Sequence, residues 1–147
     1  MNLLENTRAG FDYEIIEKLD AGLELAGHEV QSLRHKLGSL KGARVVARGG
    51  EAYLVGATIP AWQIANAPKS YDPVRPRRLL LHEKEIALIS SAESEKGLTI
   101  VPLAVYNSKR YLKLSLAIVR GKKQHDKRAS IREREEERRM SRTLRDQ

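Results

Sequence analysis

Four histidines are the side chains of this chain that best suit metal binding or proton transfer. His28 and His35 frame the stretch HEVQSLRH, in which the second histidine follows the first by seven positions. A zinc clamp on one helix needs a spacing of four, so the two imidazoles would not face the same ion. His82 and His125 stand apart in the sequence, and the chain has no cysteine to supply a thiolate. We therefore expect no metal site and no cofactor.

Carboxylates form the second group with chemical potential. The stretch DYEIIEKLDAGLE contains Asp12, Glu14 and Asp20. These could bind Mg²⁺ in a barrel-shaped ribonuclease, or they could line the solvated side of a strand. The sequence contains no nucleophile motif and no glycine-rich phosphate loop of the usual spacing. We favour the solvated strand and expect no enzymatic activity.

Charge distinguishes the end of the chain from the rest. The formal net charge is +8, and residues 120–147 carry 11 basic and 6 acidic residues. Lys and Arg bind polyanions by releasing condensed counterions, so RNA, DNA, the ribosome or anionic lipid is the expected partner. Opposite charges four positions apart in the sequence, as at Arg132 and Glu136, stabilise an isolated helix only weakly. We expect this tail to be disordered when free and helical when bound, and a passive solvated end is the alternative.

Alternating apolar residues predict a mainly β fold. Pro102 indicates an edge or bulge position, a turn is expected around Asn107 and Ser108, and Gly49 with Gly50 suits a tight hairpin. Residues 20–22 are expected to form the turn of another hairpin, between strands 13–19 and 23–25. The expected strands are 13–19, 23–25, 43–48, 51–55, 77–81, 98–106 and 111–119.

Helical periodicity appears in residues 28–38 and 83–97, which end at Gly38 and Gly97. Short strands with two helices predict a small, closed or nearly closed antiparallel β-barrel. Residues 60–76 form a loop long enough to suggest a function. We expect one domain, residues 1–119, followed by the tail. No run approaches the roughly 20 apolar residues of a membrane span, so a cytoplasmic protein without a membrane partner is expected.

Several stretches taken together resemble the small protein B family of bacteria, whose members bind transfer-messenger RNA in the rescue of stalled ribosomes. The resemblance extends from Asn6 into the tail. The matching stretches are NTRAGFDY, DAGLELAGHEVQSLR, GEAYLVGATI, DPVRPRRLLL, KGLTIVPL and RGKKQHDKR.

The resemblance implies a β-barrel of the oligonucleotide-binding type with two or three helices, which holds the tRNA-like part of the RNA. Arginine suits phosphates, asparagine a ribose or base edge, and an exposed leucine an unstacked base. For Leu80, a core position is equally compatible with the pattern. The residues implicated in RNA binding are Asn6, Arg8, Asp20, Glu29, Arg34 and Leu80.

For the tail, the resemblance implies entry into the vacant messenger channel of the small ribosomal subunit, beside the decoding centre. Elongation factor Tu would be reached through the RNA, and the protein would act as a monomer. The tail residues implicated are Gly121, Lys122, Lys123, His125, Asp126, Lys127 and Arg128.

The chain departs from the family pattern at four places. The family usually has His at Phe11, Lys at Gln31, Asp-Ser at Gly42 and Ala43, and Asn-His at Ser70 and Tyr71. Phe11 and Tyr71 could still stack on bases, which would preserve RNA binding. A structural protein of the ribosome is the remaining alternative for a basic barrel of this size.

Overall fold

The computed structural model of the protein describes residues 2–7, 13–63 and 68–121. The expectations for Arg8, Phe11 and the tail beyond Gly121 therefore lie outside the described residues. The elements in chain order are β1 (Asn2–Glu5), β2 (Tyr13–Leu23), α2 (Gly27–Arg34), β3 (Arg44–Arg48), β4 (Glu51–Val55), β5 (Arg77–Leu80), α3 (Glu83–Ser94), β6 (Leu98–Ser108) and β7 (Tyr111–Gly121).

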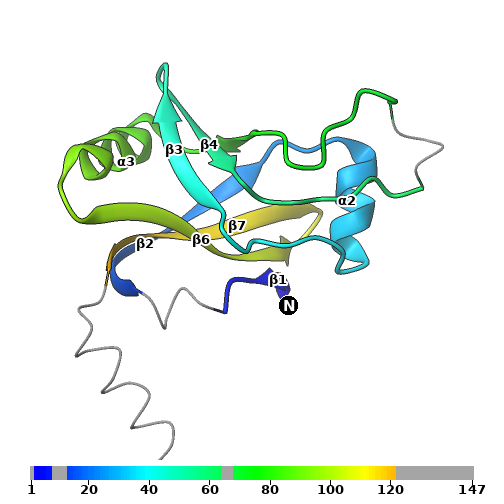
Figure 1. Ribbon diagram of the computed structural model, residues 1–147, viewed down its shortest axis with the longest axis horizontal. Coiled ribbons are helices and arrows are strands. Elements are labelled where there is room, and N and C mark those ends of the chain that lie inside the picture. The colour runs from blue at the N-terminus through cyan, green and yellow to red at the C-terminus, as the bar shows by residue number, and fades with distance from the viewer. Residues whose placement is uncertain (1, 8–12, 64–67, 122–147) are drawn as a thin grey trace, which may run out of the picture.

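The seven described strands form one antiparallel sheet in the order β1-β6-β7-β2-β5-β4-β3. The sheet curves so strongly that β3, at one edge, crosses over β6 (Figure 1). Helix α3 lies at one end of this curved sheet and α2 at the other. The predicted fold class, a mainly β chain with a nearly closed barrel and two helices, is confirmed. Neither helix of the described part is long and apolar enough to cross a membrane.

The β6–β7 hairpin contributes side chains from both of its strands to the core. The turn comes two residues later than predicted, because Ser108 pairs with Tyr111, and Lys109 takes a positive φ of 57°. The register shifts between Pro102 and Ala104, which confirms the expected bulge, since proline has no N–H to donate to the ladder. The side chains of β7 that enter the core are Leu112, Leu114, Leu116 and Ile118.

Strand β2 corrects one prediction. The hairpin expected at residues 20–22 does not form, because β2 continues through them, pairs with β7 along its length and reaches β5 at its end. Ala21 is only 1% exposed and belongs to the core, so a turn here would expose it. Gly22 serves close packing between strands: a Cβ at this position would lie 3.2 Å from the Cβ of Leu80.

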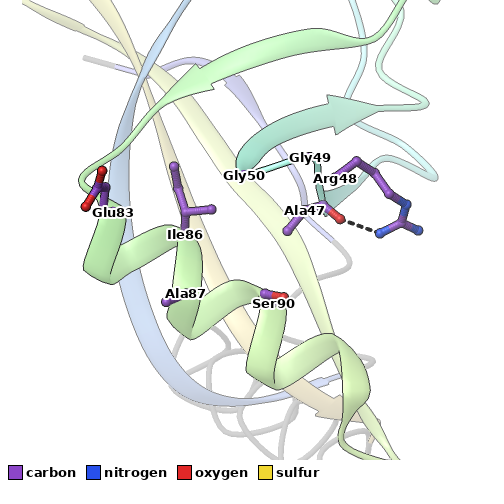
Figure 2. Close-up of a pocket in the computed structure, with 8 residues that line it drawn as sticks. All are labelled: Ala47, Arg48, Gly49, Gly50, Glu83, Ile86, Ala87 and Ser90. Atoms are coloured by element: carbon purple, nitrogen blue, oxygen red, sulfur yellow. Dashed lines mark hydrogen bonds between the residues drawn. The ribbon is translucent and has the colours of Figure 1, made fainter.

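The β3–β4 hairpin forms as predicted, with Gly49 at φ 58° and Gly50 at φ 78° in its turn. Figure 2 shows this turn opposite α3, with Ile86 pointing from the helix into the space between them. A depression of about 390 Å³ remains there. Glu93 of α3 accepts hydrogen bonds from the Ala47 backbone N–H and, at 2.8 Å, from Arg48, which joins the helix to the hairpin.

Both helices are shorter than the sequence pattern suggests. Helix α2 ends at Arg34 because Lys36 takes a left-handed conformation with φ 60°, two residues before Gly38. Helix α3 begins with the His82 N–H donating to Glu85 Oε1 at 3.0 Å, and it ends at Ser94.

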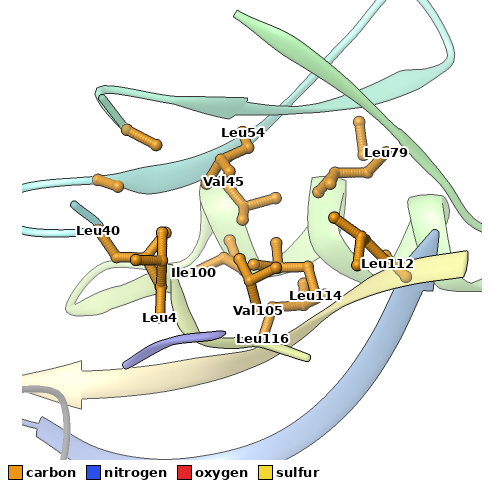
Figure 3. Packing of buried hydrophobic residues seen from close by; sticks show 14 of the residues in the cluster. Leu4, Leu40, Val45, Leu54, Leu79, Ile100, Val105, Leu112, Leu114 and Leu116 are labelled. Atoms are coloured by element: carbon orange, nitrogen blue, oxygen red, sulfur yellow. The ribbon is translucent and has the colours of Figure 1, made fainter. Parts of the chain in front are cut away.

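One apolar cluster fills the inside of the curved sheet (Figure 3). Leu33 of α2 and Ile89 of α3 enter it from the two ends, and both are completely buried. Strand β1 was not predicted, yet it contributes Leu3 and Leu4 to the same cluster. The core thus fixes α2 and the outer faces of β2 and β5, where the predicted residues Asp20, Glu29, Arg34 and Leu80 lie.

Candidate nucleic-acid interface

Two of the predicted residues meet on the outer face of the sheet. Asp20 of β2 and Leu80 of β5 line a depression of about 350 Å³, together with Gly22 and Lys113. Gly22 pairs with Leu80 on one side and with Lys113 on the other. Leu80 is 49% exposed, whereas Leu79 beside it is 0% exposed. The structure therefore places Leu80 on the surface and not in the core.

The carboxylate of Asp20 is held across the sheet. The Tyr106 hydroxyl donates to Asp20 Oδ1 at 3.0 Å. Tyr106 lies on β6 and Asp20 on β2, so this hydrogen bond crosses β7, the strand between them. Burial and this bond to a carboxylate raise the pKa of Tyr106, so it remains a donor at neutral pH. Asp20 thus presents an oriented acceptor that suits a base amino group or a ribose hydroxyl.

An ion cluster borders the same depression. Arg78 Nη1 lies 3.0 Å from Glu24 Oε2, and Arg78 Nε lies 3.0 Å from Glu51 Oε2. The hydrogen bond to Glu51, and then the one to Glu24, raise the pKa of Arg78. Its charge is already matched by two carboxylates, which leaves Lys113 as the cation of this depression that has no ion pair in the described structure.

Asn6 lies elsewhere, beside a depression of about 330 Å³ between the end of β1 and residues 38–41. Its side-chain Nδ2 donates to the Pro102 carbonyl oxygen at 2.9 Å, and its backbone N–H donates to that of Leu103 at 2.8 Å. These bonds attach the segment after β1 to the β6 bulge. Asn6 therefore fixes the path of the chain that leads towards residue 8.

Glu29 has a different environment from the other predicted residues. Its side chain is 0% exposed and accepts from Arg75, from Arg77 Nε at 2.9 Å and from the Ala26 N–H at 2.9 Å. The Tyr71 hydroxyl lies 2.9 Å from Glu29 Oε2. We call these four side chains, Glu29, Tyr71, Arg75 and Arg77, the Glu29 cluster.

The Glu29 carboxylate is strongly stabilised in its charged form. Burial alone would raise the pKa of Glu29, but Arg75, the Ala26 amide and Arg77 outweigh it and lower the pKa to about 2. Burial and the contact with Glu29 raise the pKa of Tyr71. The carboxylate has no exposed surface for a direct contact with a large ligand.

The Glu29 cluster ties the long loop to α2. Arg77 also donates to the carbonyl oxygens of Ala57 and Pro73, both at 2.9 Å, and to the Tyr71 hydroxyl at 3.0 Å. The ring of Tyr71 packs edge-on against His28, with the ring centroids 4.5 Å apart. The ends of residues 60–76 are therefore fixed against the helix by buried polar contacts.

Arg34 is exposed at the end of α2 and reaches the β6–β7 turn, where its Nη2 lies 3.4 Å from the Arg110 carbonyl oxygen. His35, the next residue, stacks on Trp62 of the long loop. Sequence analysis missed this aromatic pair, as well as the three partners of Glu29. A signal was present in RPRR, which places both arginines of the cluster at the end of the long loop.

Of the carboxylates in the ribonuclease alternative, Asp12 lies outside the described residues, and Glu14 and Asp20 do not share an ion site. Glu14 and Asp20 are six residues apart on one extended strand, a separation of about 20 Å. Within residues 2–7, 13–63 and 68–121, no group of three or more His, Asp or Glu side chains is arranged to hold a metal ion.

The comparisons with known proteins agree over almost the whole chain. A protein-family model described as SmpB protein matches residues 3–146. The SsrA-binding protein of Zymomonas mobilis is 46% identical over 145 residues, which cover 98% of this chain and 90% of the relative. That of Latilactobacillus sakei is 41% identical over 143 residues, covering 97% of this chain and 91% of the relative.

A solved structure supports the same grouping. It is described as "tmRNA-SmpB: a journey to the center of the bacterial ribosome" and superposes with a TM-score of 0.69 at 38% identity. The match covers 88% of this chain and 94% of the solved one.

Proposed function

Because the chain belongs to the SmpB protein family, we propose that it binds transfer-messenger RNA and delivers it to stalled ribosomes. The observation that carries this proposal is the extent of the match. Relatives named SsrA-binding protein align with 93% to 98% of the chain, so both the barrel and the basic tail have counterparts in them. The protein acts in the cytoplasm, as a monomer, as an adaptor and not as an enzyme.

The barrel binds the tRNA-like part of the RNA through surfaces that the structure leaves exposed. Leu80 offers an apolar face to an unstacked base, Asp20 an oriented acceptor, and Arg34 a cation for phosphate. Arg8, which lies outside the described residues, is included by its place in the family motif. Glu29 takes part indirectly, because its buried carboxylate positions the loop and the helix beside Arg34.

The tail acts in the ribosome. Strand β7 ends at Gly121, which pairs with Tyr13, so the tail leaves the barrel from a fixed point. It enters the vacant messenger channel and becomes helical there, while elongation factor Tu is engaged through the RNA. The residues beside the decoding centre are Gly121, Lys122, Lys123, His125, Asp126, Lys127 and Arg128.

A gel-shift titration with transfer-messenger RNA, run in Mg²⁺ and in EDTA, tests this function. The proposal predicts a specific complex with intact RNA under both conditions. Mg²⁺-dependent cleavage would instead support a ribonuclease. Stoichiometric copurification with all ribosomes, and not with the stalled fraction, would support a structural ribosomal protein.

A further inference from the structure

An aromatic pair stands beside Arg34 at the end of α2. The imidazole of His35 and the indole of Trp62 stack with centroids 3.9 Å apart and planes only 12° from parallel. His35 is exposed and Trp62 is partly exposed, so this pair lies at the surface and not in the core. Planar rings presented at a surface are the element that proteins use to stack unpaired nucleobases.

The His35 ring and the loop that carries Trp62 are both attached to α2 in the free protein. His35 Nδ1 lies 2.8 Å from the Gln31 carbonyl oxygen, one turn earlier in the helix, which fixes the imidazole plane. Trp62 follows Pro60 by two residues, and the Pro60 carbonyl oxygen accepts a bond of 2.5 Å from Ser32 of α2. The Glu29 cluster fixes the other end of the loop. A preorganised platform loses little entropy when a base binds.

The surrounding charge suits RNA. Residues 30–50 contain no Asp or Glu, and Arg34 and Lys36 flank His35 as exposed cations. The contact of Arg34 with the Arg110 carbonyl brings the turn residues Lys109 and Arg110 to the same end of the barrel. That turn, from residue 107 to 113, also contains no acidic residue. Phosphates on either side of a stacked base would find cations within reach.

We propose that the His35–Trp62 pair is a stacking platform for an unpaired base of the bound RNA. The base lies on the exposed side of the aromatic pair, and Arg34 and Lys36 neutralise the neighbouring phosphates. This inference rests on the proposed RNA-binding function and adds a recognition position to it. It also gives the long loop a role, which is to bring the indole onto α2.

The protein contains one tryptophan, so its fluorescence reports this position alone. The first experiment titrates the unmodified protein with transfer-messenger RNA while following both tryptophan emission and gel-shift binding. Stacking predicts quenching that saturates with the gel-shift curve. Heparin, a polyanion without bases, serves as the control and should leave the emission nearly unchanged. Equal quenching by heparin would overturn the proposal.

Two substitutions at one position complete the test. Trp62→Leu removes the ring and should weaken RNA binding about tenfold, whereas Trp62→Phe keeps a stacking surface and should lose much less. His35→Ala should also weaken binding, with an unchanged circular dichroism spectrum. RNA binding without quenching, together with full affinity of Trp62→Leu, would refute the platform and leave the proposed function intact. A complete absence of RNA binding by the unmodified protein would refute both.

Discussion

Arg77 Nε donates to Glu29 Oε2 at 2.9 Å, and both side chains are 0% exposed. The two residues are 48 positions apart in the sequence, one on α2 and the other at the start of β5. Their contact joins the helix at the proposed RNA surface to the sheet. Since a buried charge without its partner is costly, each of the two residues depends on the other.

Glu29→Gln should therefore destabilise the barrel strongly. The substitution leaves Arg77 buried and Arg75 half-buried without a counter-charge, and breaking such a pair costs about 3 to 5 kcal/mol. Urea denaturation measures the loss. The matched control is Glu24→Gln, which removes one partner of the exposed Arg78 and should cost less than about 1 kcal/mol. Equal losses in both variants would show that the Glu29 cluster contributes no more than a surface pair.

The same carboxylate predicts a pH dependence. The pKa of Glu29 is lowered to about 2 from an ordinary value of 4.5, so its charged form is favoured in the folded state. This contribution to stability is complete above about pH 4.5 and is lost as the pH falls towards 2, which amounts to about 3 kcal/mol. Unfolding measured at several pH values should show the unmodified protein and Glu29→Gln converging in acid. A constant difference between the two down to pH 2 would contradict the assignment.

Local pattern was sufficient for the parts of this fold whose contacts are close in sequence. The alternation in residues 111–119 and the Gly49-Gly50 turn predicted the hairpins because strand partners there follow each other directly. Residues 20–22 resemble a turn in composition. In the structure, Ala21 is buried in the core and Gly22 lies in close contact with Leu80, so both residues remain in the strand. Tertiary packing overrode the local preference there.

The site was less predictable for the same reason. The family resemblance indicated Glu29, but its burial follows from arginines 46 and 48 positions away, which no periodicity reveals. Leu80 was ambiguous in sequence because neighbouring leucines in a strand point to opposite faces. The stacking of His35 on Trp62 joins a helix to a loop and has no local signature at all.

Leu80 and Leu79 offer a matched pair for separating binding from folding. Leu80→Ala should weaken RNA binding by about 1 kcal/mol or more and leave the unfolding midpoint nearly unchanged, because half of the side chain is already exposed. Leu79→Ala, at a completely buried position, should cost about 2 to 5 kcal/mol of stability. Filter binding and thermal melts distinguish the two. Leu80→Ala with native affinity would remove this residue from the interface.

Arg34→Ala should reduce affinity for the RNA by about 1 to 3 kcal/mol without changing the fold. The residue is exposed and its only described hydrogen bond is the 3.4 Å contact with Arg110, so little stability depends on it. Lys96→Ala is the control, because it removes the same charge next to α3, at the opposite end of the barrel. An equal loss of affinity in both variants would mean that RNA binding depends on the net charge of the protein and not on the α2 surface.

A chain ending at Gly121 tests the proposed division of labour, in which the barrel binds the RNA and the tail acts in the ribosome. This truncation keeps the whole of β7, including the pairing of Gly121 with Tyr13. Its affinity for transfer-messenger RNA should stay within about tenfold, or 1.4 kcal/mol, of the full chain. A full-length variant with Asp126, Lys127 and Arg128 all changed to Ala should retain the same affinity.

The decisive measurement is peptide tagging on ribosomes stalled on a truncated message, with RNA binding of the same samples measured in parallel. The division of labour predicts that the truncated chain and the triple variant bind the RNA but do not support tagging. Tagging at the full rate by either protein would contradict it, because the tail would then be a passive solvated end. Loss of RNA binding by several orders of magnitude in the truncated chain would contradict it equally, because the tail would then be the main RNA anchor.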